Sequence, residues 1–256
     1  GIGFEIAKKL CENGIKTILA CRDPILGKSA ADQLQSVGYD AEFRPCDISS
    51  KSSVDNFVTN LQNDYDCIDI LVNNAAIAFK AADPTPFAEQ AAPTISVNYF
   101  GTLYITQNLL PLIKKSNTPR IVNIASLAGH LGILKSPERV KHFANPQLTI
   151  EELGNLMNEF INDVQTGQHA SKGWPNSCYG VSKLGVIALT KILARTEPDI
   201  IVNACCPGYC KTDMSSHRGI RSAEEGARTP AYLALLPSSL DCPTGLFFKD
   251  EAPVEW

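Results

Sequence analysis

Residues 16–48, "KTILACRDPILGKSAADQLQSVGYDAEFRPCDI", decide the fold of this protein. Two short apolar runs, 16–21 and 41–48, flank a longer stretch with the periodicity of a helix. The runs do not alternate strictly between apolar and polar residues, which is typical of strands covered on both faces in a parallel sheet. The segment therefore predicts a strand, a helix and a second strand.

The same order of elements continues along the chain. Further apolar runs, again separated by stretches with helical patterns, are residues 69–75, 120–126, 199–206 and 244–248. Alternating strands and helices indicate an α/β fold of the doubly wound, Rossmann type with a parallel sheet. No linker divides the 256 residues, so we expect a single domain over residues 1–256.

Composition excludes several classes of function. Lys and Arg total 23 against 27 Asp and Glu, a net charge of −4, so neither nucleic acid nor an anionic membrane is expected as a partner. No apolar run reaches the length of a membrane span. The nine cysteines are odd in number and contain no C-x-x-C pair. We expect reduced thiols, no metal site and a cytoplasmic location.

The chain begins with "GIG", and the apolar residues after it have helical spacing. Such glycines are typical of the end of a phosphate loop that enters a helix, because glycine lets the backbone approach a phosphate. A glycine turn before an ordinary surface helix fits the same letters. The phosphate-loop interpretation requires a preceding strand, so we expect that the first strand, about 10 to 12 residues, is missing from the N-terminus.

One segment interrupts the alternation, and we predict a helical insertion at about residues 130–172. Thr149 and Glu152 match a capping box at the start of its main helix, and Gly167 matches its end. Between these residues an apolar stripe recurs at helical spacing: Leu153, Leu156, Met157, Phe160, Ile161 and Val164. We expect this stripe to be buried.

Tyr179 and Lys183 are the first candidates for chemistry. They lie four residues apart in a helical run, so both side chains lie on one face. A free tyrosine titrates near 10, and a neighbouring positive charge lowers that pKa, which makes Tyr179 a candidate general acid or base. A tyrosine and a lysine on an ordinary surface helix would show the same spacing.

Two further polar residues strengthen the case for an active site. Ser126 ends a predicted strand, where its hydroxyl can stabilise a substrate oxygen that gains negative charge. Asn98 lies in a helical segment between apolar neighbours and needs a partner if it is buried, so it also fits a satisfied core amide. In open α/β sheets ligands bind beyond the carboxyl ends of the strands, where Ser126 is predicted to lie.

Taken in order, these motifs resemble those of the short-chain dehydrogenase/reductase family over the whole chain. They are "GIG" at 1–3, "NNAA" at 73–76, "NYFG" at 98–101, Ser126, Tyr179 with Lys183, and "PGYCKTDM" at 207–214. Within the family the chain is most similar to the monomeric NADPH-dependent carbonyl reductases, through "GWPNSCYGVSK" and "NACCPGYCKTDM". The resemblance implies an oxidoreductase that reduces aldehydes, ketones or quinones to alcohols.

The resemblance also implies a role for each catalytic candidate. Tyr179 would protonate the carbonyl oxygen, and Lys183 would lower the pKa of Tyr179 and hold the nicotinamide ribose. Ser126 would stabilise the developing oxyanion, and Asn98 would anchor the water chain that resupplies the proton. Hydride would come from NADPH.

Cofactor-binding residues follow in the same way. The resemblance implies contacts from Gly1, Ile2, Gly3, Asp47, Ile48, Asn74, Pro207, Gly208 and Thr212, besides Tyr179 and Lys183. Arg22 supports NADPH over NADH, because a guanidinium can pair with the 2′-phosphate that an acidic residue would repel. Asp23 beside it weakens this argument, and a solvated surface arginine is the alternative.

The substrate pocket is assigned to Ser126, Ala128, Trp174 and Tyr209, with core packing as the alternative for Trp174. Ala76 replaces the glycine of the usual N-N-A-G motif. In monomeric relatives an inserted helix is thought to cover the surface through which others assemble, so the stripe in the insertion predicts a monomer. Local packing without an effect on assembly is the alternative.

Three points stay open at the level of sequence. A hydroxysteroid or prostaglandin dehydrogenase acting oxidatively is the second candidate, because the same residues catalyse the reverse reaction. A non-catalytic dinucleotide-binding relative is the third, although all four catalytic residues are present. Four cysteines close to the motifs, Cys178, Cys205, Cys206 and Cys210, suggest a modifiable thiol, with inert buried thiols as the alternative.

Overall fold

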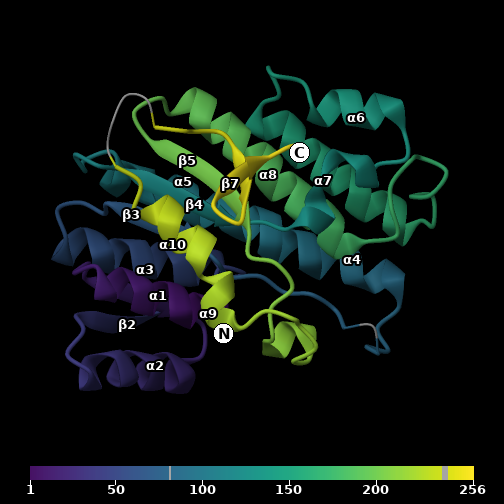
Figure 1. Ribbon diagram of the computed structural model, residues 1–256. Helices are drawn as coiled ribbons and strands as arrows, with labels where there is room; N and C mark the ends of the chain where they lie inside the picture. Colours follow the sequence, from purple (N-terminus) through teal and green to yellow (C-terminus); the bar gives the residue numbers. More distant parts are fainter. Residues whose placement is uncertain (81, 238–241) are drawn as a thin grey trace.

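The computed structural model describes residues 1–80, 82–237 and 242–256 (Figure 1). Its strands are β1 (Thr17–Cys21), β2 (Ala41–Pro45), β3 (Ile70–Asn73), β4 (Arg120–Ile124), β5 (Ile201–Cys206), β6 (Phe247–Lys249) and β7 (Ala252–Val254). Six of these strands lie in the predicted runs. The seventh was not predicted, because it has three residues and contains Pro253, which is typical of an edge strand.

Helices connect the strands in the expected alternation. They are α1 (Ile2–Glu12), α2 (Pro24–Ser36), α3 (Lys51–Asp64), α4 (Phe87–Ile95), α5 (Thr102–Ile113), α6 (Pro137–Phe143), α7 (Ile150–Gln165), α8 (Cys178–Thr196), α9 (Ala223–Gly226) and α10 (Arg228–Ala234). A π-helical turn, η1 (Ser96–Gly101), joins α4 to α5. Three short 3₁₀ turns are η2 (Leu127–Gly129), η3 (Leu131–Ile133) and η4 (Asp213–Ser215).

The sheet is parallel, as predicted, but it is divided into two parts. Strands β3, β4, β5 and β6 pair in parallel, in that order, and β7 adds an antiparallel edge. Strand β2 pairs in parallel with β1 in a separate two-stranded sheet. Apart from β7, the carboxyl ends of the strands in each part therefore point the same way, which gathers the loops after them at one edge.

Burial on both faces explains why the central strands read as continuous apolar runs. All five residues of β4 are buried. Ile121 packs with α3, α5 and α8, whereas Val122 and Ile124 pack on the other face with α1 and α10. The two helix layers on either side of β3–β5 can be followed in Figure 1. The result is the predicted doubly wound α/β architecture.

The main helix of the insertion is α7, and its predicted ends are confirmed. The Thr149 hydroxyl accepts from the Glu152 amide at 3.1 Å, and the Glu152 carboxylate accepts from the Thr149 amide at 2.8 Å. Gly167 follows the helix with a φ of +70°, a conformation that favours glycine. The stripe is buried most fully at Leu153, Met157, Phe160 and Val164, and α7 packs against α4 and α8.

Candidate active site

Tyr179, Lys183 and Ser126 lie together at the carboxyl end of β4. Tyr179 and Lys183 occupy successive turns of α8, which packs across β4 and β5, and Ser126 is the second residue after β4. The Lys183 ammonium donates to the Ile124 carbonyl oxygen at 2.7 Å and lies 5.6 Å from the centre of the Tyr179 ring. The Ser126 side chain is hydrogen-bonded to that of Tyr179. The structure thus brings together three of the predicted catalytic residues.

The electrostatics of this group differ from the sequence-based expectation. Burial, with a smaller contribution from Cys206, raises the pKa of Tyr179 to about 12, and only the Ser126 hydrogen bond acts to lower it. Burial lowers the pKa of Lys183 to about 8. Lys183 is not among the groups that shift the pKa of Tyr179, so the expected lowering by Lys183 is not found. Tyr179 is a protonated donor at neutral pH.

The side chain of Asn98, in the π-helical turn η1, makes three hydrogen bonds. Its amide nitrogen donates to the Ile77 carbonyl oxygen and to the Ser182 hydroxyl, both at 2.9 Å, and its oxygen accepts from the Ile77 amide at 2.7 Å. The Ser182 hydroxyl donates in turn to the Tyr179 carbonyl oxygen at 2.7 Å. Asn98 therefore links the loop after β3 to the catalytic turn of α8. Both of its side-chain N–H groups are already used, so a water molecule could hydrogen-bond only to the backbone of Asn98 or to the second lone pair of its side-chain oxygen.

Ser182 and the Ile124 carbonyl group are site components that the sequence analysis missed. A serine inside a helix and a backbone carbonyl group carry no signal in the sequence, because their roles depend on which elements pack against them. The hydrogen bonds of both groups join residues that are far apart in the chain.

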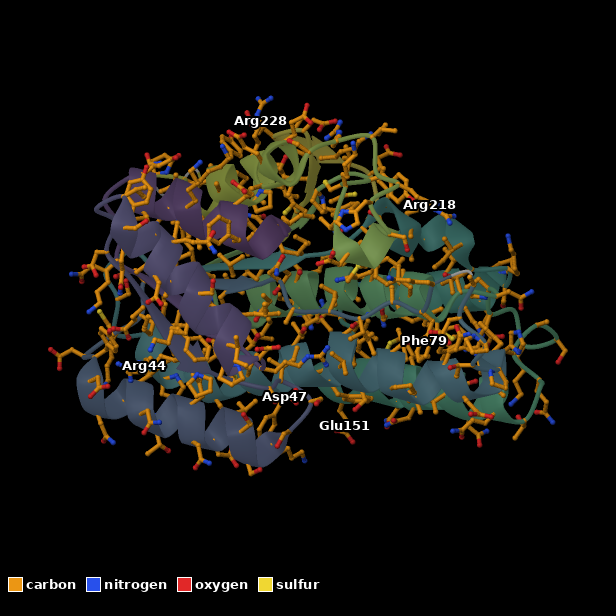
Figure 2. All side chains as sticks on the ribbon, turned by 90° about the horizontal axis from the view of Figure 1, so that it is seen from below. Arg44, Asp47, Phe79, Glu151, Arg218 and Arg228 are labelled. Atoms are coloured by element: carbon orange, nitrogen blue, oxygen red, sulfur yellow. The ribbon has the colours of Figure 1, made fainter. Side chains whose placement is uncertain are left out.

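Several loops that follow strands gather at the same edge of the molecule. In Figure 2, Phe79 in the loop after β3 and Arg218 in the loop after β5 lie on one side, whereas Arg44 within β2 lies on the opposite side. The two ends of the loop segment 211–221, after β5, are joined by a backbone hydrogen bond: the Lys211 amide donates to the Arg221 carbonyl oxygen at 2.8 Å. Thr212 and Gly208, predicted to contact the cofactor, lie in this loop.

The start of α1 is built for close approach of the backbone. A β-carbon on Gly3 would lie 2.6 Å from the side-chain nitrogen of Asn74, so Gly3 and Asn74 are in contact, whereas Gly1 faces open space. The side chain of Ile2 packs near Gly226 and against the buried cluster of α1 and α10. The first amides of an 11-residue helix lack helical acceptors and attract phosphate, so this end fits the pyrophosphate of a dinucleotide.

Arg22 and Asp47 lie near each other beyond β1 and β2. Hydrogen bonds from Ser49 lower the pKa of Asp47, and the positive charge of Arg22 lowers it further. The Asp23 carboxylate accepts from the amides of Ile25 and Leu26 and caps α2. Because the N-terminus of α2 stabilises this negative charge, Asp23 only slightly reduces the attraction of a phosphate to Arg22. These residues fit a 2′-phosphorylated dinucleotide.

Ile48, Pro207 and Gly208 show similarly tight surroundings. A β-carbon on Gly101, the last residue of η1, would lie 2.6 Å from the Ile48 carbonyl oxygen, so η1 and the backbone of Ile48 are in close contact. Gly208 has a φ of +84°, and Pro207 before it follows the end of β5 directly. A larger residue at Gly208 would be strained, so the turn requires glycine.

The pocket assignment of Trp174 is wrong. Its side chain is 1% exposed, its indole nitrogen donates to Asp163 at 3.0 Å, and the Arg139 guanidinium lies 3.8 Å from the ring centre. Trp174 therefore belongs to a buried cluster inside the insertion. Ala128, in contrast, is exposed beside Ser126, and Tyr209 is 54% exposed in the loop after β5. Both are accessible to a substrate.

The cysteines beside the motifs are buried. Burial raises the pKa of Cys178 to about 12, and it raises the pKa of Cys205 and of Cys210 as well. Cys206 is 4% exposed and accepts from the Gly208 amide. Protonated, buried thiols react slowly, which favours the inert alternative for these residues.

The model of the family described as short chain dehydrogenase matches residues 1–137 and 164–222. The chain belongs to the short chain dehydrogenase family. The match is interrupted at 138–163, which covers most of α6 and most of α7. The interruption lies inside the segment that the sequence analysis interpreted as an insertion.

Curated relatives in this family cover the whole chain. Carbonyl reductase [NADPH] 1 of Rattus norvegicus is 44% identical, and that of Homo sapiens is 42% identical, in each case over 100% of this chain and 95% of the relative. Among solved structures, salutaridine reductase from Papaver somniferum superposes with a TM-score of 0.90 at 30% identity, covering 97% of this chain and 96% of that chain. The fold and the family are thus supported independently.

Proposed function

We propose that this short chain dehydrogenase reduces the carbonyl group of aldehydes, ketones or quinones to an alcohol with NADPH. The observation that carries the proposal is the arrangement of the half-buried Tyr179 and Ser126 beside the buried Lys183 at the carboxyl end of β4. The relatives named carbonyl reductase [NADPH] support the choice of reaction and cofactor. None of the described helices is long and apolar enough to cross a membrane.

The side chains supply the proton chemistry of this reaction. NADPH, when bound, supplies a hydride to the carbonyl carbon. Tyr179 donates its phenolic proton to the carbonyl oxygen, and Ser126 donates a hydrogen bond to the same oxygen as negative charge builds on it. The product is an alcohol and the tyrosine is left as a phenolate, which is stabilised by the nearby Lys183 ammonium.

Lys183 and Asn98 keep Tyr179 ready for the next turnover. The Lys183 ammonium is fixed by the Ile124 carbonyl group and has further donors for the nicotinamide ribose. Asn98 fixes Tyr179 through Ser182, and its surroundings form one end of the path by which water returns a proton. We assign the cofactor contacts to Gly1, Ile2, Gly3, Asp47, Ile48, Asn74, Pro207, Gly208 and Thr212.

The test is oxidation of NADPH by the purified protein, with a panel of quinones, aldehydes and ketones. We expect turnover with NADPH, and much slower turnover with NADH. Binding of NADPH without turnover of any carbonyl compound would contradict the proposal and favour a dinucleotide-binding protein.

Arg22→Glu is expected to reverse the cofactor preference. The substitution removes a charged partner of the 2′-phosphate and adds a repelling charge, so the KM for NADPH should rise roughly 10- to 100-fold while that for NADH changes little. Steady-state kinetics with both cofactors measure this. Arg228→Glu is the control, because Arg228 lies in α10 and pairs with Glu251. An equal effect of the two substitutions on NADPH would refute the assignment of Arg22.

The insertion also supports a proposal about assembly and location. Because α7 covers α4 and α8 with its apolar stripe, little apolar surface is left there for a second subunit. We expect a monomer of 27.7 kDa by sedimentation equilibrium. A stable dimer or tetramer would contradict this proposal. The negative net charge and free thiols favour a cytoplasmic enzyme.

A further inference from the structure

The turn that follows Ser126 is pressed against the catalytic helix without intervening side chains. A β-carbon on Gly129, in η2, would lie 2.5 Å from the Leu184 amide nitrogen and 2.9 Å from the β-carbon of Lys183. On the helix side, a β-carbon on Gly180 would lie 2.8 Å from the Ala128 carbonyl oxygen. Two glycines thus allow the backbone of the turn to approach α8 beside both Tyr179 and Lys183.

The same turn holds Ser126 in place. The Ala128 amide donates to the Ser126 hydroxyl oxygen at 3.2 Å, and the Gly129 amide donates to the Ser126 carbonyl oxygen at 2.9 Å. Any movement of Gly129 away from α8 therefore shifts the backbone of Ser126 and the direction of its hydroxyl group. Lys183 is anchored separately by Ile124, so it does not depend on the turn.

Trp256 contacts this turn from a distant part of the chain. Its indole nitrogen donates to the Gly129 carbonyl oxygen at 3.0 Å. The indole is fixed in turn, because β7 pairs with β6 and the ring packs on a buried cluster that includes Val186 of α8 and Phe247 of β6. The Lys191 ammonium lies 5.4 Å from the ring centre. Trp256 therefore bonds to Gly129 from a packed position, and the C-terminal end of the chain lies near α8 and β7 in Figure 1.

We infer that Trp256 is a positioning residue for Ser126. Its N–H holds Gly129 against α8, and Gly129 sets the orientation of the hydroxyl group that meets the carbonyl oxygen. This inference rests on the proposed function for its catalytic consequence, whereas the contact itself concerns the polypeptide alone. Small displacements of a group that meets the reacting atoms lower rates strongly, so one hydrogen bond at this distance affects turnover.

The test replaces Trp256 with phenylalanine, which keeps an aromatic ring and removes the N–H donor. We expect kcat for carbonyl reduction to fall about tenfold while the Kd for NADPH changes less than about twofold, because the loss affects Ser126 and spares Lys183. In the protein without NADPH or substrate, amide hydrogen exchange in the peptide that contains Ala128 and Gly129 should accelerate about tenfold. Gly129→Ala, whose β-carbon would clash with α8 at Lys183 and Leu184, should also lower kcat and accelerate this exchange, but it is not expected to spare NADPH binding.

Lys191→Met is the matched control, because it removes the charge over the Trp256 ring and leaves the N–H donor. We expect it to have wild-type kcat and hydrogen exchange at a temperature where all variants are folded. Wild-type kcat in Trp256→Phe would overturn the inference, as would unchanged exchange in the turn. If the wild-type protein reduces no carbonyl compound, the proposed function fails, and the exchange result still decides whether Trp256 holds the turn.

Discussion

Tyr179→Phe is expected to lower kcat for carbonyl reduction by about 10³-fold, within the range that general acid catalysis supplies. Phenylalanine retains the ring and removes the phenolic proton that Tyr179 transfers to the carbonyl oxygen. The Kd for NADPH should stay within a few-fold of wild type, because Lys183 remains bonded to Ile124. Single-turnover kinetics and cofactor fluorescence measure the two quantities separately.

Two comparisons make this result specific. Tyr232→Phe is the control, since Tyr232 lies partly exposed on α10 and its loss should leave kcat unchanged. Lys183→Met should lower kcat and also weaken NADPH binding, because the ammonium serves both. If Tyr179→Phe keeps more than about a tenth of wild-type kcat, another group donates the proton to the carbonyl oxygen.

Asp163→Ala is expected to lower the free energy of unfolding by about 3–5 kcal/mol, the effect of removing one partner from a buried ion pair. The Asp163 side chain is fully buried, and its carboxylate lies 2.5 Å from the Lys172 ammonium and 3.5 Å from the Arg139 guanidinium. It also accepts from Trp174 at 3.0 Å. Alanine would leave the buried Arg139 without this partner and create a cavity. Urea denaturation measures the change.

A second variant separates charge from shape. Asp163→Asn keeps the size of the side chain and an acceptor for Trp174, but it removes the charge and replaces the oxygen that accepts from Lys172 with a donor, so its loss of stability measures the ion pair without a cavity. Lys172→Met should have a smaller effect than Asp163→Ala, since the Lys172 side chain is 41% exposed and water already screens it. A change below about 1 kcal/mol for Asp163→Ala would show that the cluster does not stabilise the insertion.

The sequence by itself determined the elements and their order. Each of the six predicted strands carries a local run of apolar residues, and burial on both faces explains why those runs do not alternate. The ends of α7 were also predictable, because the capping box of Thr149 and Glu152 and the glycine at 167 act within one turn of the chain. The pairing of Tyr179 with Lys183 is equally local, since helical spacing alone puts them on one face.

Only the tertiary structure decided how these groups behave. The pKa of Tyr179 rises because packing removes water from the phenol, and Trp174 serves the buried cluster around Asp163 instead of the pocket. The bond from Trp256 to Gly129 joins residues 127 positions apart. Such contacts and the desolvation that accompanies them depend on which segments pack together across the sheet, and no short-range pattern in the chain specifies that arrangement.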